Sequence, residues 1–163
     1  MTLARSSYDD NISLLYRKVN EVFQRNWESR VRVTKKGQAL KDIKEKVATW
    51  SWALNKNRAI ETGLARLRMG HVGLRQHLHR FSMADTPLCE CGEVENIVHF
   101  LLDCPNSVQA RNQMTTNIKN CGITNQVTVK LLLGGSDLPE YQQMIIVSEV
   151  SKFLVVSGRI HEL

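Results

Sequence analysis

The sequence predicts a compact, mostly α-helical domain, and three features of the chain support this fold class. Apolar residues recur at spacings of three and four through most of the chain, which is the period of one helix face. Glycine or proline follows several of these segments, where helices commonly end. The chain has 163 residues, 42% of them hydrophobic, which is enough for one ordinary domain with a sizeable core. We therefore expect residues 1–163 to form a single domain.

The domain is expected to have three parts. They are a basic helical part over residues 1–84, a loop and helix over 85–106, and C-terminal helices over 107–163. Residues 1–80 hold 17 Lys and Arg against 7 Asp and Glu, a balance of +10, whereas the remaining residues hold 5 against 9, a balance of −4. Such an asymmetry indicates a basic face for a polyanion, joined to a second half with a different role.

The basic part is predicted to contain four helices separated by short connections. Their ranges are 8–29, 38–50, 56–69 and 74–81, with 30–36 as a connector. The third helix should end at Gly70 in a left-handed cap, and its outward face should carry Arg58, Glu61 and Arg68.

The basic part also holds the three tryptophans of the chain, Trp27, Trp50 and Trp52. Such large aromatic rings are expected mainly to fill the core. The alternative is that Trp50 or Trp52 stacks on an unpaired base, because the neighbouring residues are so basic.

The C-terminal half is predicted to continue as helices over 93–103, 107–120 and 128–133. Asp137 and Glu140 have the spacing of a capping box, which would open a final helix that runs to Ser157. This last helix is so apolar that it should be buried on most sides.

Three cysteines and one histidine between the two halves have the spacing of metal ligands, C-x-C-x7-H-x4-C. The residues are Cys89, Cys91, His99 and Cys104. Four such ligands suit zinc and leave no open coordination position, so the site would be structural. Gly92 gives the turn around the first two cysteines its backbone freedom.

The other two ligands, His99 and Cys104, lie five residues apart on a predicted helix. In a regular helix this spacing rotates the side chains by about 500°, or about 140° out of alignment. Pro105 resolves the conflict if the helix ends at Cys104. Three buried thiols beside an unrelated histidine, or a C-x-C redox pair, are the alternatives. Cys121 is expected to be a small buried hydrophobic residue.

Catalytic motifs are not found in the sequence. The chain lacks H-E-x-x-H, a deaminase H-x-E with C-x-x-C, G-x-S-x-G and a P-loop, and its other histidines have no paired acids. We expect a protein that is not an enzyme. Long apolar runs and a secretory leader are also not found, which predicts an intracellular protein, nuclear or cytoplasmic.

Several sequence blocks around the cysteines resemble the C-terminal zinc-binding (CCHC) segment of non-LTR, LINE-type retrotransposon reverse transcriptase polyproteins. The blocks are Leu64 to His71, His77 to Phe81, Pro87 to Gly92 and His99 to Pro105, and the resemblance is weaker outside residues 58–105. It implies the same four zinc ligands. It also implies an accessory role in which the module helps RNA or target DNA engage the polymerase. The catalytic carboxylates of the polymerase and nuclease have no counterpart here.

The hypothesis that follows is a helical, zinc-stabilised module that binds nucleic acid, preferably RNA, with a reverse transcriptase in the same polypeptide as a partner. Phosphate contacts are expected from the basic side chains, and His71 is expected to stack on a base. The expected binding residues are Lys35, Lys36, Lys41, Lys44, Arg58, Arg66, Arg68, His71, Arg75 and Arg80. The alternative is a protein-interaction or oligomerisation module that uses the apolar final helix, through Phe153 and Leu154.

Overall fold

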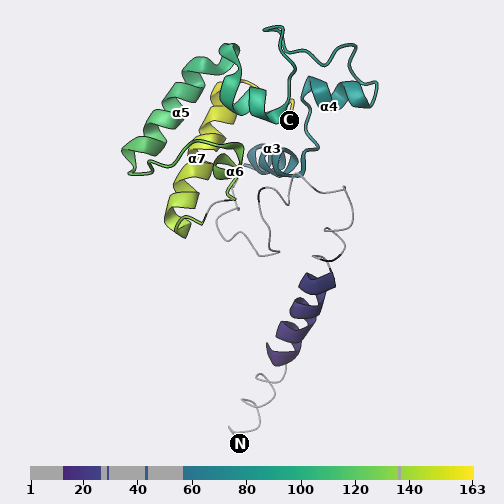
Figure 1. The fold of residues 1–163 in the computed structure, drawn as a ribbon, viewed down its shortest axis with the longest axis vertical. Helices are drawn as coiled ribbons and strands as arrows, with labels where there is room; N and C mark the ends of the chain where they lie inside the picture. The colour runs from purple at the N-terminus through teal and green to yellow at the C-terminus, as the bar shows by residue number, and fades with distance from the viewer. Residues whose placement is uncertain (1–12, 27–28, 30–42, 44–56, 136) are drawn as a thin grey trace, which may run out of the picture.

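A computed structural model describes residues 13–26, 29, 43, 57–135 and 137–163, and this part of the chain is largely helical (Figure 1). The only β pairing in these residues is an isolated antiparallel bridge between Leu88 and Val94. The prediction of a mostly α fold is therefore confirmed. The elements are α3 Arg58–Met69, α4 Arg75–Arg80, η1 His99–Asp103, η2 Pro105–Ser107, α5 Val108–Asn120, α6 Val129–Leu132 and α7 Glu140–Val156.

Residues 13–26 form a further helix, drawn in purple in Figure 1. The apolar side of this helix, predicted from its periodicity, is exposed, with Tyr16 68% and Phe23 60% accessible. The connector 30–36, the tryptophans and nearly all of the predicted helix 38–50 lie outside the described residues. Ile43 is the exception in that helix, and it is helical and buried.

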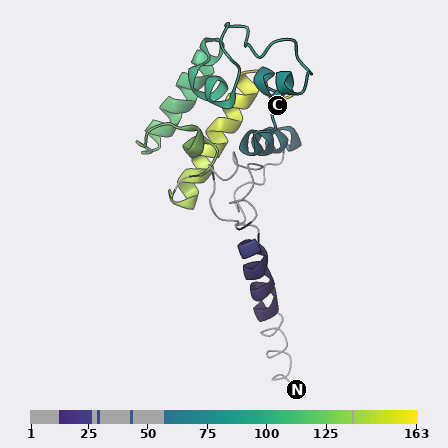
Figure 2. The same cartoon turned by 45° about the vertical axis from the view of Figure 1, so that its right-hand side comes forward.

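Helix α7 is the centre of the described fold. It packs against α5, α6 and α3, and Figures 1 and 2 show α5 lying along it in both views. The apolar side chains of α7 thus contact neighbouring helices on several sides, as predicted. Every helix within the described residues is too short or too polar to span a bilayer.

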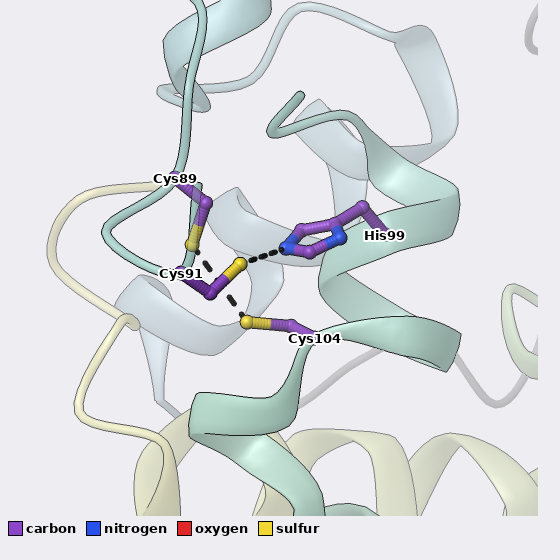
Figure 3. Close-up of side chains that lie close together, drawn as sticks. All are labelled: Cys89, Cys91, His99 and Cys104. Carbon is purple, nitrogen blue, oxygen red and sulfur yellow. Dashed lines mark hydrogen bonds between the residues drawn. The ribbon is translucent and has the colours of Figure 1, made fainter. Parts of the chain in front are cut away.

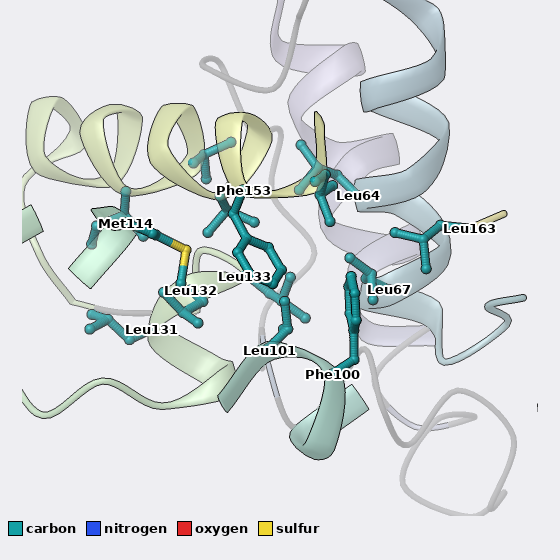
Figure 4. Close-up of a cluster of buried hydrophobic side chains, with 14 of the residues drawn as sticks. Leu64, Leu67, Phe100, Leu101, Met114, Leu131, Leu132, Leu133, Phe153 and Leu163 are labelled. Carbon is teal, nitrogen blue, oxygen red and sulfur yellow. The ribbon is translucent and has the colours of Figure 1, made fainter. Parts of the chain in front are cut away.

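The core forms where α7 meets its neighbours, and Figure 4 shows the side chains that fill it. Phe153 from α7 is 1% exposed, and its ring centroid lies 5.4 Å from that of Phe100 in η1. Leu154 is fully buried. Both side chains are therefore used inside the domain, and the alternative in which Phe153 and Leu154 bind a partner does not fit their positions.

The ends of the helices test the predicted caps. Gly70 ends α3 with φ 72°, so the predicted left-handed cap is confirmed, and Gly158 follows α7 with the same φ of 72°. The predicted capping box is wrong, because the residue before α7 is Pro139 and no side chain caps this helix. The Gln143 amide group donates to the carbonyl oxygen of Leu138 at 2.6 Å instead.

The C-terminal residues pack against α3 and the connection that follows it. Leu163 is 2% exposed, and its carbonyl oxygen accepts a hydrogen bond from Arg66 Nη1 at 2.6 Å. A Cβ atom at Gly73 would lie 1.8 Å from the carbonyl oxygen of Glu162. Only glycine allows this close approach of two backbones.

Arg68 lies on the buried side of α3, not on the outward face predicted from the sequence. It is 6% exposed, and its Nε donates to the carbonyl oxygen of Leu133 at 3.0 Å. Burial lowers the pKa of Arg68 to about 10, although Glu61 acts in the opposite direction. The prediction from helical periodicity is wrong because the long side chain of Arg68 reaches a buried backbone oxygen and donates a hydrogen bond to it.

Candidate metal centre

Cys89 and Cys91 lie in a tight turn that is closed by backbone hydrogen bonds. The Cys89 N–H donates to the Glu93 carbonyl oxygen at 2.7 Å, and the Gly92 N–H donates to the Cys89 carbonyl oxygen at 2.9 Å. Gly92 has φ 94°, a conformation that glycine adopts without steric cost. The predicted turn and the role of its glycine are confirmed.

The helix that carries His99 starts later than predicted. Residues 93–96 are extended or turn-like, and helical geometry begins at Ile97. The side-chain oxygen of Asn96 accepts a hydrogen bond from the His99 N–H at 2.8 Å, as an N-cap residue does. The predicted start at Glu93 is wrong because Asn96, rather than the acidic residues before it, caps this helix.

His99–Asp103 form a π-helix, which brings the last two candidate ligands to the same side. The Cys104 N–H donates to the His99 carbonyl oxygen, five residues back, at 2.7 Å. This i to i+5 pattern has more residues per turn than an α-helix, so His99 and Cys104 are separated by about one turn. Cys104 then leaves the helix with φ −57° and ψ 121°, as expected before Pro105.

The four candidate ligands converge on one point (Figure 3), as the sequence predicts. Their sulfur and nitrogen atoms all lie within 4.8 Å of one another. The Sγ atoms of Cys89 and Cys104 are 3.7 Å apart, and Cys91 Sγ lies 3.3 Å from His99 Nε2. A tetrahedral zinc site would place such pairs at about 3.8 Å and about 3.6 Å. The four side chains can therefore hold a metal ion.

The pKa of Cys89 differs from that of a reactive redox thiol. Burial raises the pKa of Cys89 to about 11, and its neighbour Cys104 adds to this effect. Reactive redox thiols have lowered pKa values, whereas metal ligands become thiolates when a cation displaces their protons. The convergence of His99 on the same point argues against an unrelated histidine. Cys121 is exposed and outside the cluster, so the prediction that it is buried is wrong.

Arg111 supports the cluster from α5, although the sequence gave no sign of this role. Its Nε donates to the Leu101 carbonyl oxygen at 3.2 Å, and its Nη2 bonds the carbonyl oxygen of Cys104. The guanidinium thus bonds two carbonyl groups at the end of η1, and the carbonyl oxygen of Cys104 also accepts the Ser107 N–H at 3.2 Å. Arg111 also places a positive charge beside a site that three thiolates would make negative.

Glu95 joins the metal-binding loop to two other parts of the fold. Its side chain is 2% exposed, and Oε1 lies 2.8 Å from Arg159 Nη1, near the C-terminus. Its Oε2 accepts the N–H of Arg75 at 2.8 Å, and its carbonyl oxygen accepts that of Gln76 at 3.2 Å. These two N–H groups belong to the first turn of α4, where a helix has no partners of its own. Glu95 therefore fixes α4 against the candidate metal centre.

The charge on Glu95 makes a testable contribution to stability. Burial alone would raise its pKa, but the hydrogen bonds from Arg159 and Arg75 outweigh burial and lower the pKa below its ordinary value near 4.5. A lowered pKa in the folded state means that the stabilisation is present above about pH 4.5 and is lost as pH falls. We expect Glu95→Gln to be less stable than the wild type at pH 7, by about 1–3 kcal/mol.

Urea unfolding of both proteins at a series of pH values between 7 and 3.5 checks this prediction. The difference between the two should shrink as the pH falls below about 4.5. Elemental analysis at each pH identifies the range in which both proteins retain the metal, and the comparison is made within it, because metal release would itself unfold the segment that carries Glu95. A difference that stays constant over this range would contradict the role given to the carboxylate.

The predicted nucleic-acid contacts are only partly present at the surface of the described chain. Arg58, His71, Arg75 and Arg80 are exposed, and Arg66 is exposed although it bonds Leu163. Arg68 is buried and is not available at the surface. Lys35, Lys36, Lys41 and Lys44 lie outside the described residues.

Helix α4 carries two exposed arginines of the predicted set, Arg75 and Arg80, and it contains no acid. Its sequence is Arg-Gln-His-Leu-His-Arg. The metal-binding loop is different, because Glu90, Glu93 and Asp103 are exposed there. Two of these acids, Glu93 and Asp103, line a shallow pocket of about 330 Å³ beside His99. A polyanion would be repelled from this side and attracted to α4.

Comparisons with known proteins find a similar sequence in a retrotransposon polyprotein. The chain is 26% identical over 139 residues to the retrovirus-related Pol polyprotein from type-1 retrotransposable element R1 4 of Nasonia vitripennis. The alignment covers 82% of this chain but only 30% of the length of that polyprotein. Neither a family model nor a solved structure matches the chain. The similarity supports an origin of this chain in a retrotransposon polyprotein.

Proposed function

We propose that this chain is an accessory module that binds nucleic acid, preferably RNA, and that a structural zinc ion holds it together. It has a binding role rather than an enzymatic one, and it works beside a reverse transcriptase in the same polypeptide. The observation that carries the proposal is the exposed basic helix α4, which Glu95 fixes to the candidate metal centre. The similarity to a retrotransposon Pol polyprotein supports the same role.

Zinc is the metal we propose because three thiolates and one imidazole suit it. Thiolates are soft ligands, and zinc commonly takes Cys3His sets in closed tetrahedral sites. Cys89, Cys91, His99 and Cys104 would fill all four positions, so no position is left for an activated water. The ion would act by joining the turn at Cys89 to the end of η1.

The arrangement gives the metal centre an indirect role in binding. Its own surface is acidic, whereas α4 presents Arg75 and Arg80 at the surface. Their guanidinium groups can form bidentate hydrogen bonds with phosphates. The metal-binding loop holds the start of α4 through Glu95 and thereby sets the direction in which these side chains point.

A salt series tests the proposed function. The zinc-loaded chain should bind fluorescent single-stranded RNA at low salt, with weaker binding to duplex DNA, and the affinity should fall steeply as salt rises. The double variant Arg75→Gln/Arg80→Gln should bind more weakly. For a single strand, it should also reduce the slope of log affinity against log salt by roughly 1–2.

The matched control is Lys119→Gln/Lys130→Gln, which removes two exposed charges from α5 and α6. This control has the same net charge as the double variant, so general electrostatics affects both alike. An equal loss of affinity in the two variants would argue against a site on α4. Undetectable binding of every RNA and DNA at low salt would contradict the proposed function itself.

The alternative function is a protein-interaction or oligomerisation module, and exposed apolar side chains favour it. They lie on the helix 13–26 and on the outer face of α7, not at Phe153 and Leu154 as expected from the sequence. The mass of the chain in solution distinguishes the two functions, since a monomer that binds RNA would argue against this alternative. The most exposed of these side chains are Leu15, Tyr16, Phe23, Tyr141 and Val156.

A further inference from the structure

Three aromatic rings lie in a row at the surface near α4. The ring centroids of His71 and His77 are 5.4 Å apart in an edge-on arrangement, and those of His77 and Phe81 are 5.0 Å apart. His71 comes from the connection after α3, whereas His77 lies in α4 and Phe81 directly follows it. The row is thus built from side chains of two consecutive segments, which Gly73 and Leu74 connect.

Phe81 is the outer end of this row. Its side chain is 56% exposed, and the guanidinium carbon of Arg80 lies 5.7 Å from the centre of its ring. A large aromatic ring at this exposure leaves much apolar surface in water, which costs free energy unless a ligand covers it. The cation beside the ring limits what that ligand can be.

The histidine behind Phe81 presents a neutral ring at neutral pH. Burial lowers the pKa of His77, and the neighbouring His71 and Arg80 lower it further. A neutral imidazole can pack against Phe81 as an aromatic group without placing another charge beside Arg80. The row therefore combines a flat apolar surface with a single strong cation at its outer end.

We propose that Phe81, supported by His77 and flanked by Arg80, is a stacking site for one unpaired base of a single-stranded nucleic acid. The inference rests on the proposed function and deepens it, because it names the form of the ligand. The base would lie against the Phe81 ring, and the adjoining phosphate would be bound by Arg80. Arg75, at the start of the same helix, would contact a phosphate further along the strand.

The combination of ring and cation favours an unpaired base over other occupants. A base offers a flat π surface with a negative phosphate close by, which matches an aromatic side chain next to an arginine. A paired base is stacked between its neighbours and cannot cover the Phe81 ring. An apolar peptide would cover the ring but would leave Arg80 without a counter-charge.

The test compares two oligonucleotides of equal length and charge, one with uridine bases and one in which the bases are replaced by abasic sites. The full zinc-loaded chain should bind the uridine strand more tightly. Phe81→Leu should weaken binding of the uridine strand roughly 5- to 150-fold, the range for loss of one stacked base. It should leave binding of the abasic strand nearly unchanged, and Phe81→Trp should retain the affinity.

Tyr141→Leu is the matched control, because Tyr141 is an aromatic residue of similar exposure, 61%, on α7. It should bind both strands like the wild type. A DNA strand with thymine bases should show the same dependence on Phe81, since stacking does not require the ribose.

Three results would overturn the proposal. The first is a wild type that binds both strands equally. The second is a Phe81→Leu variant that loses the same affinity for both strands, which would indicate that Phe81 supports the local structure and does not stack on a base. The third is an undetectable affinity for every strand at low salt, which would also overturn the proposed function. The first two results leave that function intact.

Discussion

Replacing Cys104 with serine is expected to release the metal and unfold the segment from residue 85 to residue 107. Cys104 links the end of η1 to the turn at Cys89, and the binding energy of a structural metal contributes directly to folding. We expect the free energy of unfolding to fall by at least about 4 kcal/mol, the range reached when a structural metal is lost. Elemental analysis and urea unfolding at a fixed free zinc concentration measure both effects.

Cys121→Ser is the control for this experiment. Cys121 is exposed and lies outside the cluster of ligands, so its replacement should change stability by less than about 0.5 kcal/mol. Both variants exchange one thiol for one hydroxyl, and they differ only in whether the thiol can reach the metal. Equal stability and equal zinc content in the two variants would contradict a structural metal centre.

Truncating Phe153 to alanine is expected to cost about 3–5 kcal/mol, as for other phenylalanines in well-packed cores. Its ring is 1% exposed and contacts Phe100 of η1, so the cavity would lie between α7 and the helix that carries His99. Val156→Ala, on the same helix but at a side chain that is 67% exposed, should cost less than about 0.5 kcal/mol. Urea unfolding of the two variants measures the difference.

The same pair of variants separates a core position from a subunit interface. If Phe153 were part of an interface, its truncation would reduce the mass in solution and have little effect on the stability of the monomer. A Phe153→Ala variant with normal unfolding and reduced mass would therefore contradict its place in the core.

The sequence was sufficient to predict the helical fold and the four candidate ligands. Helical periodicity identified α3, α5 and α7 closely, because each has several apolar residues that share one face. The ligands Cys89, Cys91, His99 and Cys104 were predicted because their residue types and spacing have few other uses. Both predictions rest on local patterns, and such patterns are visible in a single sequence.

Structural details that depend on tertiary contacts could not be predicted from the sequence. The helix ends at Cys104 as predicted, but its last turn is the π-helix His99–Asp103, whose signal in the sequence was only the mismatch of about 140°. Helical periodicity predicts an outward position for Arg68, but its side chain lies inward and bonds the carbonyl oxygen of Leu133. Glu95 was expected near the start of a helix, and it instead bonds Arg75 and Arg159, which are 20 and 64 residues away in the chain.

Amide hydrogen exchange at Arg75 and Gln76 tests most directly whether the metal-binding loop holds α4 in place. Their N–H groups bond Glu95 and have no partner within α4, so their protection reports the link to the loop. We predict that chelation of zinc removes this protection, whereas amides in the middle of α5 remain protected. Unchanged protection at Arg75 and Gln76 in the metal-free protein would contradict the account.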